Sequence, residues 1–190
     1  MKNGEGYIKE FNNYGNIIFI GSYFNGKING NGKEYDDNRC LIFEGEYKDW
    51  KRWNGKGYNG EKNVVYELKN GIGNVKEYED NILTFEGEYL NGERNGKGKE
   101  YGKDGKLIFE GIYLNGKRIG KGKEYYKSGE LKFEGEYLNG ERNGEGKEYY
   151  KNGELKFEGE FLYYFKKRGR RFIKGRIEYE GEYEYGKNGI

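Results

Sequence analysis

The chain has 190 residues, a net charge of +2, 35 glycines and 18% aromatic residues. Histidine is absent, which excludes catalytic sites with a histidine base and zinc sites with a histidine ligand. Cys40 is the only cysteine, which excludes a disulfide within the chain. No apolar segment approaches the roughly 20 residues of a membrane-spanning helix. The first residues, MKNGEGYIKEF, lack the apolar core of a secretory signal, and we expect a cytoplasmic protein.

A motif that begins with an aromatic residue, or with Val64 in one unit, recurs along the chain at intervals of 21 to 24 residues. The motif FEGEY occurs at 43–47, 85–89 and 133–137, and variants of it occur at 19–23, 109–113, 157–161 and 179–183. A period of this length indicates a repeat array, in which one supersecondary unit is stacked many times. We predict a single array over residues 1–190, with a partial unit at 1–18 and further units that begin near residues 19, 43, 64, 85, 109, 133, 157 and 179.

Each regular unit predicts two short strands and two tight turns. In residues 131–138, LKFEGEYL, alternate residues share a face, which is the period of a β-strand. The next residues contain Asn-Gly, the strongest short signal for a hairpin turn, because both residues tolerate positive φ. Residues 145–150 form the second predicted strand, and 151–153 turn the chain into the next unit. Glycine recurs too often for a helix.

Stacked units of this kind predict an all-β fold. We expect an elongated, twisted, single-layer antiparallel meander of about eight hairpins, with no α-helix of note. A single layer must obtain its core from aromatic rings packed along one face. Motif glycines such as Gly135 lie between two aromatic residues, and we expect rings to cover them. On the other face we expect rows of glutamate beside lysines of the facing strand.

Two neighbouring units depart from the regular pattern. The unit at 43–57 has one extra residue, and its turn holds both tryptophans, Trp50 and Trp53. Exposed aromatic residues are common interface anchors, so both are candidate partner-binding residues. The alternative is that they pack against the next unit, 64–73, which lacks the motif glycine and has a shorter turn.

The repeated aromatic positions form a second candidate surface. We expect this aromatic face to line a groove for an apolar helix or an extended peptide. The alternative is that the rings pack on one another as the only core available. The residues concerned include Tyr47, Tyr89, Tyr113, Tyr137 and Phe161.

The unit at 157–171 also has an extra residue, and its turn is replaced by LYYFKKRGRR. Tyr163, Tyr164 and Phe165 are candidate partner-binding residues. We predict that a basic loop follows them at 166–176 and could bind an anionic lipid surface, at about 1 kcal/mol for each cation. An acidic protein, nucleic-acid phosphates, or a solvated edge without a ligand are the alternatives. The candidate anion-binding or lipid-binding residues are Lys166, Lys167, Arg168, Arg170, Arg171, Lys174 and Arg176.

The sequence gives little support for catalysis. Paired carboxylates occur in every unit, whereas a catalytic pair would occur once. The sequence GKGYNG at 55–60 matches GxGxxG but lies in a predicted hairpin, so we expect no dinucleotide cofactor. We predict no catalytic, cofactor or metal site. Residues 179–190 predict a hairpin without its second strand, and such an open edge would favour a homodimer.

The unit closely resembles the MORN (membrane occupation and recognition nexus) repeat. Residues 19–32, 85–98, 109–122 and 133–146 each contain an aromatic residue, Gly and a second aromatic residue, followed by Gly-x-x-x-Gly-x-Gly. The resemblance implies a curved, groove-bearing, all-β ribbon. Repeats of this family occur in cytoskeletal and junctional scaffolds, beside lipid-kinase and methyltransferase domains, and in bacterial proteins that include a family labelled as antitoxins.

These observations favour a non-enzymatic scaffold in the cytoplasm that binds a protein partner through the aromatic groove or the irregular turns. One alternative is a peripheral membrane or phosphoinositide-binding protein that uses residues 166–176, with a membrane or cytoskeletal location. Another is a regulatory, antitoxin-like partner of an enzyme, and a further one is an accessory part of a larger enzyme. Nucleic acid is the least favoured partner.

Overall fold

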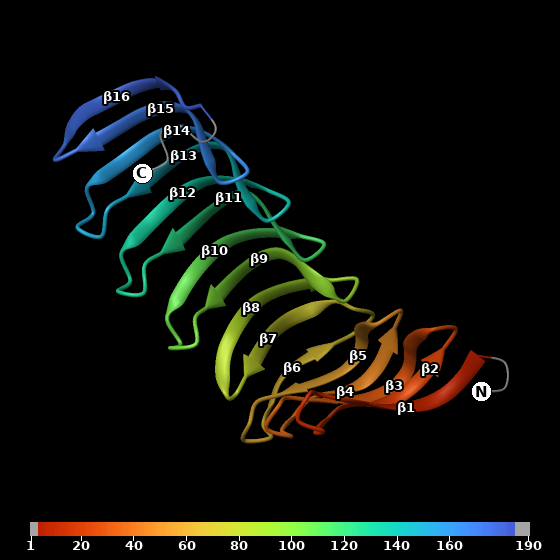
Figure 1. Ribbon diagram of the computed structural model, residues 1–190. Coiled ribbons are helices and arrows are strands. Elements are labelled where there is room, and N and C mark those ends of the chain that lie inside the picture. The colour runs from red at the N-terminus through yellow and green to blue at the C-terminus, as the bar shows by residue number, and fades with distance from the viewer. Residues whose placement is uncertain (1–3, 185–190) are drawn as a thin grey trace. The chain divides into compact units, whose positions relative to one another are not determined.

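The computed structural model describes residues 4–184, in which sixteen β-strands occur and no α-helix (Figure 1). The strands are β1 (Glu5–Phe11), β2 (Ile17–Phe24), β3 (Lys27–Tyr35), β4 (Leu41–Lys48), β5 (Lys51–Tyr58), β6 (Val64–Leu68), β7 (Gly73–Glu79), β8 (Ile82–Leu90), β9 (Glu93–Tyr101), β10 (Leu107–Leu114), β11 (Lys117–Tyr125), β12 (Leu131–Leu138), β13 (Glu141–Tyr149), β14 (Leu155–Leu162), β15 (Phe165–Ile173) and β16 (Arg176–Glu182). The predicted all-β meander of hairpins is confirmed.

Strands that follow one another in the chain are hydrogen-bonded neighbours, in a six-stranded sheet from β1 to β6 and a ten-stranded sheet from β7 to β16. By its contacts the chain divides into two compact units. The first unit comprises residues up to 96 together with 103–105, and the second comprises 97–102 together with 106 onward. The predicted edge at 179–190 lies partly outside the described residues.

The regular hairpin has the predicted register and turn. In β12 and β13, Phe133 lies opposite Glu148, Gly135 opposite Gly146 and Tyr137 opposite Arg142. The turn between them, Asn139–Gly140, has φ values of 54° and 96°. Positive φ at both central residues matches the right-handed twist of the strands, which explains why Asn-Gly recurs at this position.

The core of the second unit is a chain of aromatic rings that lie over glycines. Phe133 is fully buried, and a Cβ added to Gly135 or Gly146 would come within 2.6 Å of its ring. The ring contacts Tyr137 edge to face at 5.7 Å between centroids and Phe161 at 5.0 Å. Each such pair contributes about 0.5–1.5 kcal/mol beyond its buried area. The rings of successive hairpins therefore interlock, and the glycines leave room for them.

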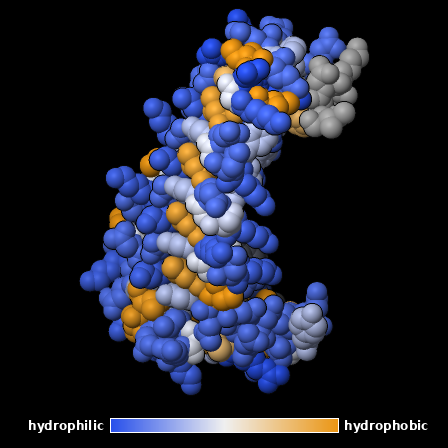
Figure 2. Space-filling view, turned by 90° about the vertical axis from the view of Figure 1, so that its left-hand side faces the viewer, coloured by the Kyte–Doolittle hydropathy of each residue, from blue (hydrophilic) through white to orange (hydrophobic). Residues whose placement is uncertain are grey.

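The opposite face carries the predicted rows of charge. Lys147 of β13 lies opposite Glu134 on one neighbouring strand and Glu158 on the other. In the first unit, the Nζ of Lys33 lies 2.9 Å from a carboxylate oxygen of Glu44. Figure 2 shows apolar side chains that surface at intervals among charged ones rather than in one large patch.

The hydrogen-bonded ladder is interrupted between β6 and β7, where a single bridge joins Lys69 and Ile72. Elsewhere, two strands approach closely at a pair of glycines, as at Gly135 and Gly146. By register, the corresponding positions of β6 and β7 hold Leu68, which lies opposite Gly55, and Val75, which lies opposite Gly87. Both side chains are buried, so the two backbones cannot meet there. The short repeat at 64–73 thus divides the predicted continuous sheet in two.

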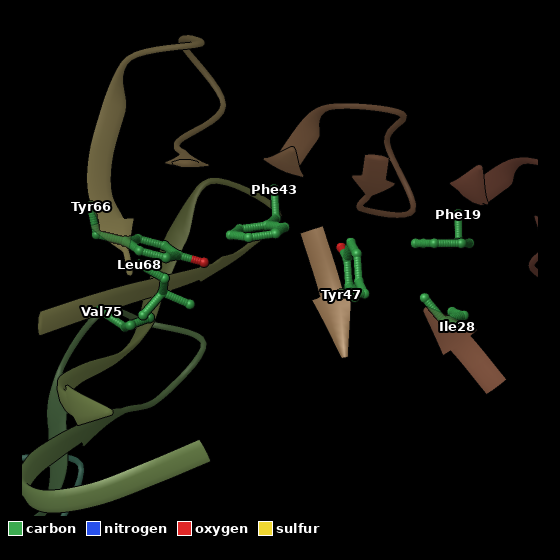
Figure 3. Packing of buried hydrophobic residues seen from close by; sticks show 7 residues of the cluster. All are labelled: Phe19, Ile28, Phe43, Tyr47, Tyr66, Leu68 and Val75. Carbon is green, nitrogen blue, oxygen red and sulfur yellow. The ribbon is translucent and has the colours of Figure 1, made fainter. Parts of the chain in front are cut away.

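The buried side chains of the irregular repeat at 64–73 complete the core of the first compact unit. The ring of Tyr66 lies over Gly57 and stacks beside Phe43 at 6.3 Å between centroids (Figure 3). Leu68 and Val75 fill the adjoining space (Figure 3). A tyrosine from β6 thus takes the place that a motif phenylalanine holds over the glycines of a regular hairpin.

Candidate interaction surface

Backbone hydrogen bonds join the Asn-Gly turns of neighbouring hairpins into rows. In the first unit, the N–H of Trp50 donates to the carbonyl of Ile28 at 3.0 Å, and the N–H of Gly71 donates to that of Trp53 at 2.7 Å. The N–H of Gly92 then donates to the carbonyl of Gly71. We call residues 24–27, 48–51, 69–72 and 90–93 the first turn row.

The second unit contains an equivalent row. The N–H of Gly140 donates to the carbonyl of Arg118 at 2.9 Å, and the N–H of Tyr164 donates to that of Arg142 at 3.0 Å. We call residues 114–117, 138–141 and 162–165 the second turn row. In both rows, the backbone of the bonded turns is fixed by a neighbouring hairpin, while side chains such as Trp50 and Tyr163 remain exposed.

One turn in each row has large side chains in the left-handed conformation. Asp49 and Trp50 have φ values of 49° and 73°, and Tyr163 and Tyr164 have values of 48° and 69°. These values resemble those of the Asn-Gly turns, so the backbone is the same although the residues differ. For a residue with a Cβ this conformation costs roughly 1–2 kcal/mol. The two turns therefore carry aromatic rings at an energetic cost that Asn-Gly would avoid.

The two tryptophans have different environments. Trp50 remains 49% exposed, although its ring contacts Tyr23 edge to face at 6.1 Å. Trp53 is half-buried, and its carbonyl accepts a hydrogen bond from Gly71 of the irregular repeat at 64–73. The Nζ of Lys48 lies 4.6 Å from the centroid of the Trp53 ring. Trp53 thus packs against the irregular unit, as one of the two sequence interpretations expected, and Trp50 is the ring available to a partner.

The aromatic residues of the second row also have different environments. The hydroxyl of Tyr164 donates to the carbonyl of Gly140 at 3.0 Å, which ties this turn to the preceding one. Tyr163 is 51% exposed and its hydroxyl has no hydrogen-bond partner among residues 4–184. Phe165, which follows the turn, is exposed as well. Of the three candidates here, Tyr163 and Phe165 present the most accessible rings.

The aromatic residues expected to line a groove are part of the core. Four of the five, Tyr47, Tyr113, Tyr137 and Phe161, are buried, and Tyr89 is half-buried. Their rings pack on the motif phenylalanines, as Tyr137 does on Phe133 and Phe109. The alternative of self-packing is therefore the one that the structure supports, and these rings leave little surface for a ligand.

A buried network of tyrosine, glutamate and arginine accompanies these rings, and the sequence analysis missed it. The hydroxyl of Tyr137 donates to Glu124 at 2.8 Å, and Arg142 donates to both oxygens of the same carboxylate at 3.0 and 2.5 Å. The guanidinium also lies 4.1 Å from the ring centroid of Phe133. Other hairpins repeat this arrangement with Tyr47, Glu34 and Arg52, with Tyr89, Glu77 and Arg94, and with Tyr113, Glu100 and Arg118.

The electrostatics around Glu124 favour one protonation state for Glu124 and for Tyr137. Burial raises the pKa of Glu124, but hydrogen bonds from Arg142 and Tyr137 outweigh it, and the net pKa lies below its usual value. Burial and the charge of Glu124 raise the pKa of Tyr137. The tyrosine therefore stays a donor and the glutamate an acceptor. Their spacing was a usable signal, since each glutamate comes 12 or 13 residues before its tyrosine.

The predicted basic loop at 166–176 is wrong, because most of it is strand β15. Four of its seven cations form ion pairs with glutamates, three of which come from neighbouring strands. The pairs are Lys166 with Glu148 at 3.0 Å, Lys167 with Glu160 at 2.6 Å, Arg170 with Glu158 at 2.6 Å, and Arg171 with Glu178. Alternation along a strand also sends neighbouring side chains to opposite faces. The structure therefore does not gather these cations into one patch.

The family model of the MORN repeat matches residues 19–40, 85–106, 109–130 and 133–154. The protein carries MORN repeats. Each matched segment begins at a motif phenylalanine that is buried in its hairpin. The turns with Trp50 and Tyr163 lie outside the matched segments of the MORN array. A comparison with curated proteins gives no match.

A cavity of about 400 Å³ lies within the first unit of the MORN array, beside the interrupted ladder. Arg52, Arg94 and Lys76 line it together with Glu77 and Tyr58. Both arginines are held by carboxylates, Arg52 by Glu34 and Arg94 by Glu77. Residues 4–184 contain no group of three side chains suited to hold a metal ion. None of them forms a helix that could span a membrane. The exposed turns remain the best-supported candidate surface.

Proposed function

We propose that this MORN repeat protein is a non-enzymatic scaffold in the cytoplasm that binds a protein partner through the exposed aromatic residues of its irregular turns. MORN repeats are typical of interaction and membrane-associated proteins, and the family is generally without enzymatic activity. The anchors are Trp50, Tyr163 and Phe165, whereas Trp53 and Tyr164 hold their turns in place.

The conformation of two turns supports this proposal. Large aromatic residues occupy left-handed positions that Asn-Gly fills in the neighbouring turns. Strained backbone that the core does not require is a reason to look for a function at that place. Aromatic side chains that protrude from a fixed backbone also lose little conformational entropy on binding, which suits an interface anchor.

A membrane function has weaker support. Arg168, Lys174 and Arg176 have no ion pair within residues 4–184, and Ile173 and Ile177 are exposed beside the turn between β15 and β16. An apolar and basic turn of this kind could touch an anionic membrane. We expect any such binding to be weak, and sedimentation with liposomes of an anionic lipid would detect it. A variant with Lys174→Glu and Arg176→Glu would then lose it.

Affinity capture followed by quantitative mass spectrometry tests the protein-binding function. The bait is the full chain, compared with a variant that carries Trp50→Gly and Tyr163→Asn. Both substitutions install residues that favour the existing turn, so the variant should fold at least as well. We expect a partner in stoichiometric amount with the full chain and its loss by about tenfold or more with the variant.

A matched control is Lys127→Ser, an exposed change in the turn between β11 and β12, at the opposite ends of the strands. It should retain the partner. Equal capture by the full chain and by the double variant would refute the role of the aromatic turns. If the captured protein is an enzyme, an assay of its activity with added scaffold tests the regulatory alternative, and light scattering of the chain alone tests the homodimer.

A further inference from the structure

The two turn rows differ in charge, and the difference indicates what the first row binds. We propose that the first turn row docks an acidic amphipathic helix of a partner protein, with its apolar side chains on the exposed apolar residues of the row and its carboxylates on the lysines. This inference rests on the proposed function and names the partner chemistry of one of its surfaces.

Apolar surface recurs at every turn of the first row. Phe24 is 41% exposed, Trp50 is 49%, Ile72 is 55% and Leu90 is 42%. Each comes from a different turn, and the hydrogen bonds between turns hold them in sequence. Scattered exposed apolar residues need no explanation, but a row of four on a fixed backbone forms a surface that a partner can cover.

The charges of the first row are mostly positive. Its sixteen residues include the lysines at 27, 48, 51 and 69, and only two acids, Asp49 and Glu93, so the row has a net charge of +2. Both acids are already paired, Asp49 with Lys27 at 2.9 Å and Glu93 with Lys51 at 2.8 Å. Lys69 has no ion pair within the described chain, and Lys48 lies over the ring of Trp53. A partner with acidic residues therefore complements the row, and a basic one does not.

The hydrogen bonds between the turns favour a helix over an added strand as the bound element. A strand that pairs with a sheet needs free N–H and C=O groups in a line. In the row, the N–H groups of Trp50, Gly71 and Gly92 already donate to carbonyls of neighbouring hairpins. The row therefore offers side chains rather than a free edge, and side-chain contact across several turns is how an amphipathic helix binds.

The spacing of the turns also fits a helix. Neighbouring strands of the regular ladder lie about 4.8 Å apart, so the turns at 24–27 and 48–51 are separated by about 10 Å. The turns at 48–51, 69–72 and 90–93 are packed more closely, since Gly92 lies against the backbone of Arg52 and bonds to Gly71. Seven residues of an α-helix rise about 10.5 Å and three to four residues rise about 5 Å, so a helix with apolar residues at positions i, i+3, i+4 and i+7 can contact turns at both spacings. Glutamates on either side of that stripe would lie near Lys48 and Lys69.

The second turn row provides an internal comparison. It has one cation, Lys117, and one acid, Glu141, and its exposed apolar residues include Leu114 and Leu138. The backbone hydrogen bonds between its turns are equivalent. An acidic helix should therefore prefer the first row, because only that row adds a net positive charge to the apolar surface.

Fluorescence anisotropy with designed peptides tests the inference on the full chain. The probe is a labelled helix of about 21 residues with Leu or Phe at positions i, i+3, i+4 and i+7 and glutamates beside this apolar stripe. One control peptide has the same composition in scrambled order, and another has lysine in place of each glutamate. We expect binding of the acidic helix to weaken about tenfold with Trp50→Gly and about tenfold with Lys48→Glu plus Lys69→Glu. Leu138→Ser, in the second row, should leave it unchanged.

The inference is overturned if the scrambled or the basic peptide binds equally well, or if the variants bind like the original chain. It is also overturned if anionic vesicles bind at the first row and the acidic helix does not. Thermal melts of both variants exclude unfolding as the cause of a loss. If a captured partner depends on Trp50 or Tyr163 but no acidic helix binds, the proposed function stands and this inference fails. If no partner depends on either ring, both fail.

Discussion

The first and second turn rows have similar backbones and different surfaces. In both, turns with two positive φ values are joined by a hydrogen bond to the preceding hairpin. The first row has four lysines and two acids, whereas the second has one of each and is otherwise apolar or polar without charge. Because the frame is set by buried phenylalanines and glycines, the outer turn residues can vary without disturbing it. Differences between the rows are therefore expected to change the surface of the protein more than its stability.

The largest expected effect on stability comes from disrupting the aromatic core. Phe133→Ala removes a fully buried ring that contacts Tyr137 of its own hairpin and Phe161 of the next, and we expect it to destabilise the second unit by about 4 kcal/mol. Chemical denaturation followed by circular dichroism measures the loss. Both tryptophans lie in the first unit, so their fluorescence reports on that unit separately. A loss below about 1 kcal/mol would show that the rings are not the core.

Removal of one buried charge should have the next largest effect. Glu124→Gln removes the carboxylate that accepts two hydrogen bonds from the buried Arg142 and leaves Glu148, at 3.9 Å, as the remaining counter-charge, so we expect a loss of about 2 kcal/mol in the free energy of unfolding. Denaturation of this variant beside Glu134→Gln, a change on the half-exposed opposite face, measures the difference. The two should be clearly unequal, since only the first breaks an ion pair with a buried arginine.

The same carboxylate predicts a dependence on pH. Its pKa in the folded chain lies below the usual 4.5. A group with a depressed folded pKa stabilises the fold above its unfolded pKa, and that stability is lost as the pH falls through the folded value. We therefore expect the second unit to lose stability below about pH 4.5. Acid titrations of the original chain and of Glu124→Gln test this, and the variant should show the smaller slope.

A smaller effect of opposite sign is expected in the strained turns. Tyr163→Asn replaces a tyrosine at a φ of 48° that makes no hydrogen bond through its hydroxyl, and we expect a gain of about 0.5 kcal/mol. Thermal melts against Asn139→Tyr, the reverse change in the next turn of the same row, sharpen the test. The two variants should shift the midpoint in opposite directions. Shifts of the same sign would mean that the turn backbone is not strained.

The smallest effect on stability should come from the exposed lysines. Lys69→Glu is expected to change the free energy of unfolding by less than about 0.5 kcal/mol, because the side chain is exposed and has no ion pair. Denaturation monitored by tryptophan fluorescence measures this in the first unit. If Lys69→Glu weakens the binding of the acidic peptide without a change in stability, this lysine contributes to binding and not to the stability of the fold.

Much of the hairpin could be predicted from the sequence, because its signals are local. The alternation in 131–138, the Asn-Gly turn at 139–140 and the pairing of rings with glycines all involve residues close in the chain. Three features were missed or wrong. The glutamate network depends on which strand ends face each other, the basic segment is balanced by acids on adjacent strands, and the interrupted ladder depends on Leu68 and Val75 together. Each needs the register between strands, which no single stretch of sequence contains.

The hydrogen bonds between turns also have a meaning for how such a protein acquires new specificity. A turn such as Asp49–Trp50 presents two side chains from a position that the neighbouring hairpin has already fixed. Changing those two residues alters the exposed side chains and leaves the hairpin backbone unchanged. In the regular ladder, each further hairpin adds another turn about 10 Å along. In a hairpin array of this kind, the exposed residues can therefore be changed one turn at a time.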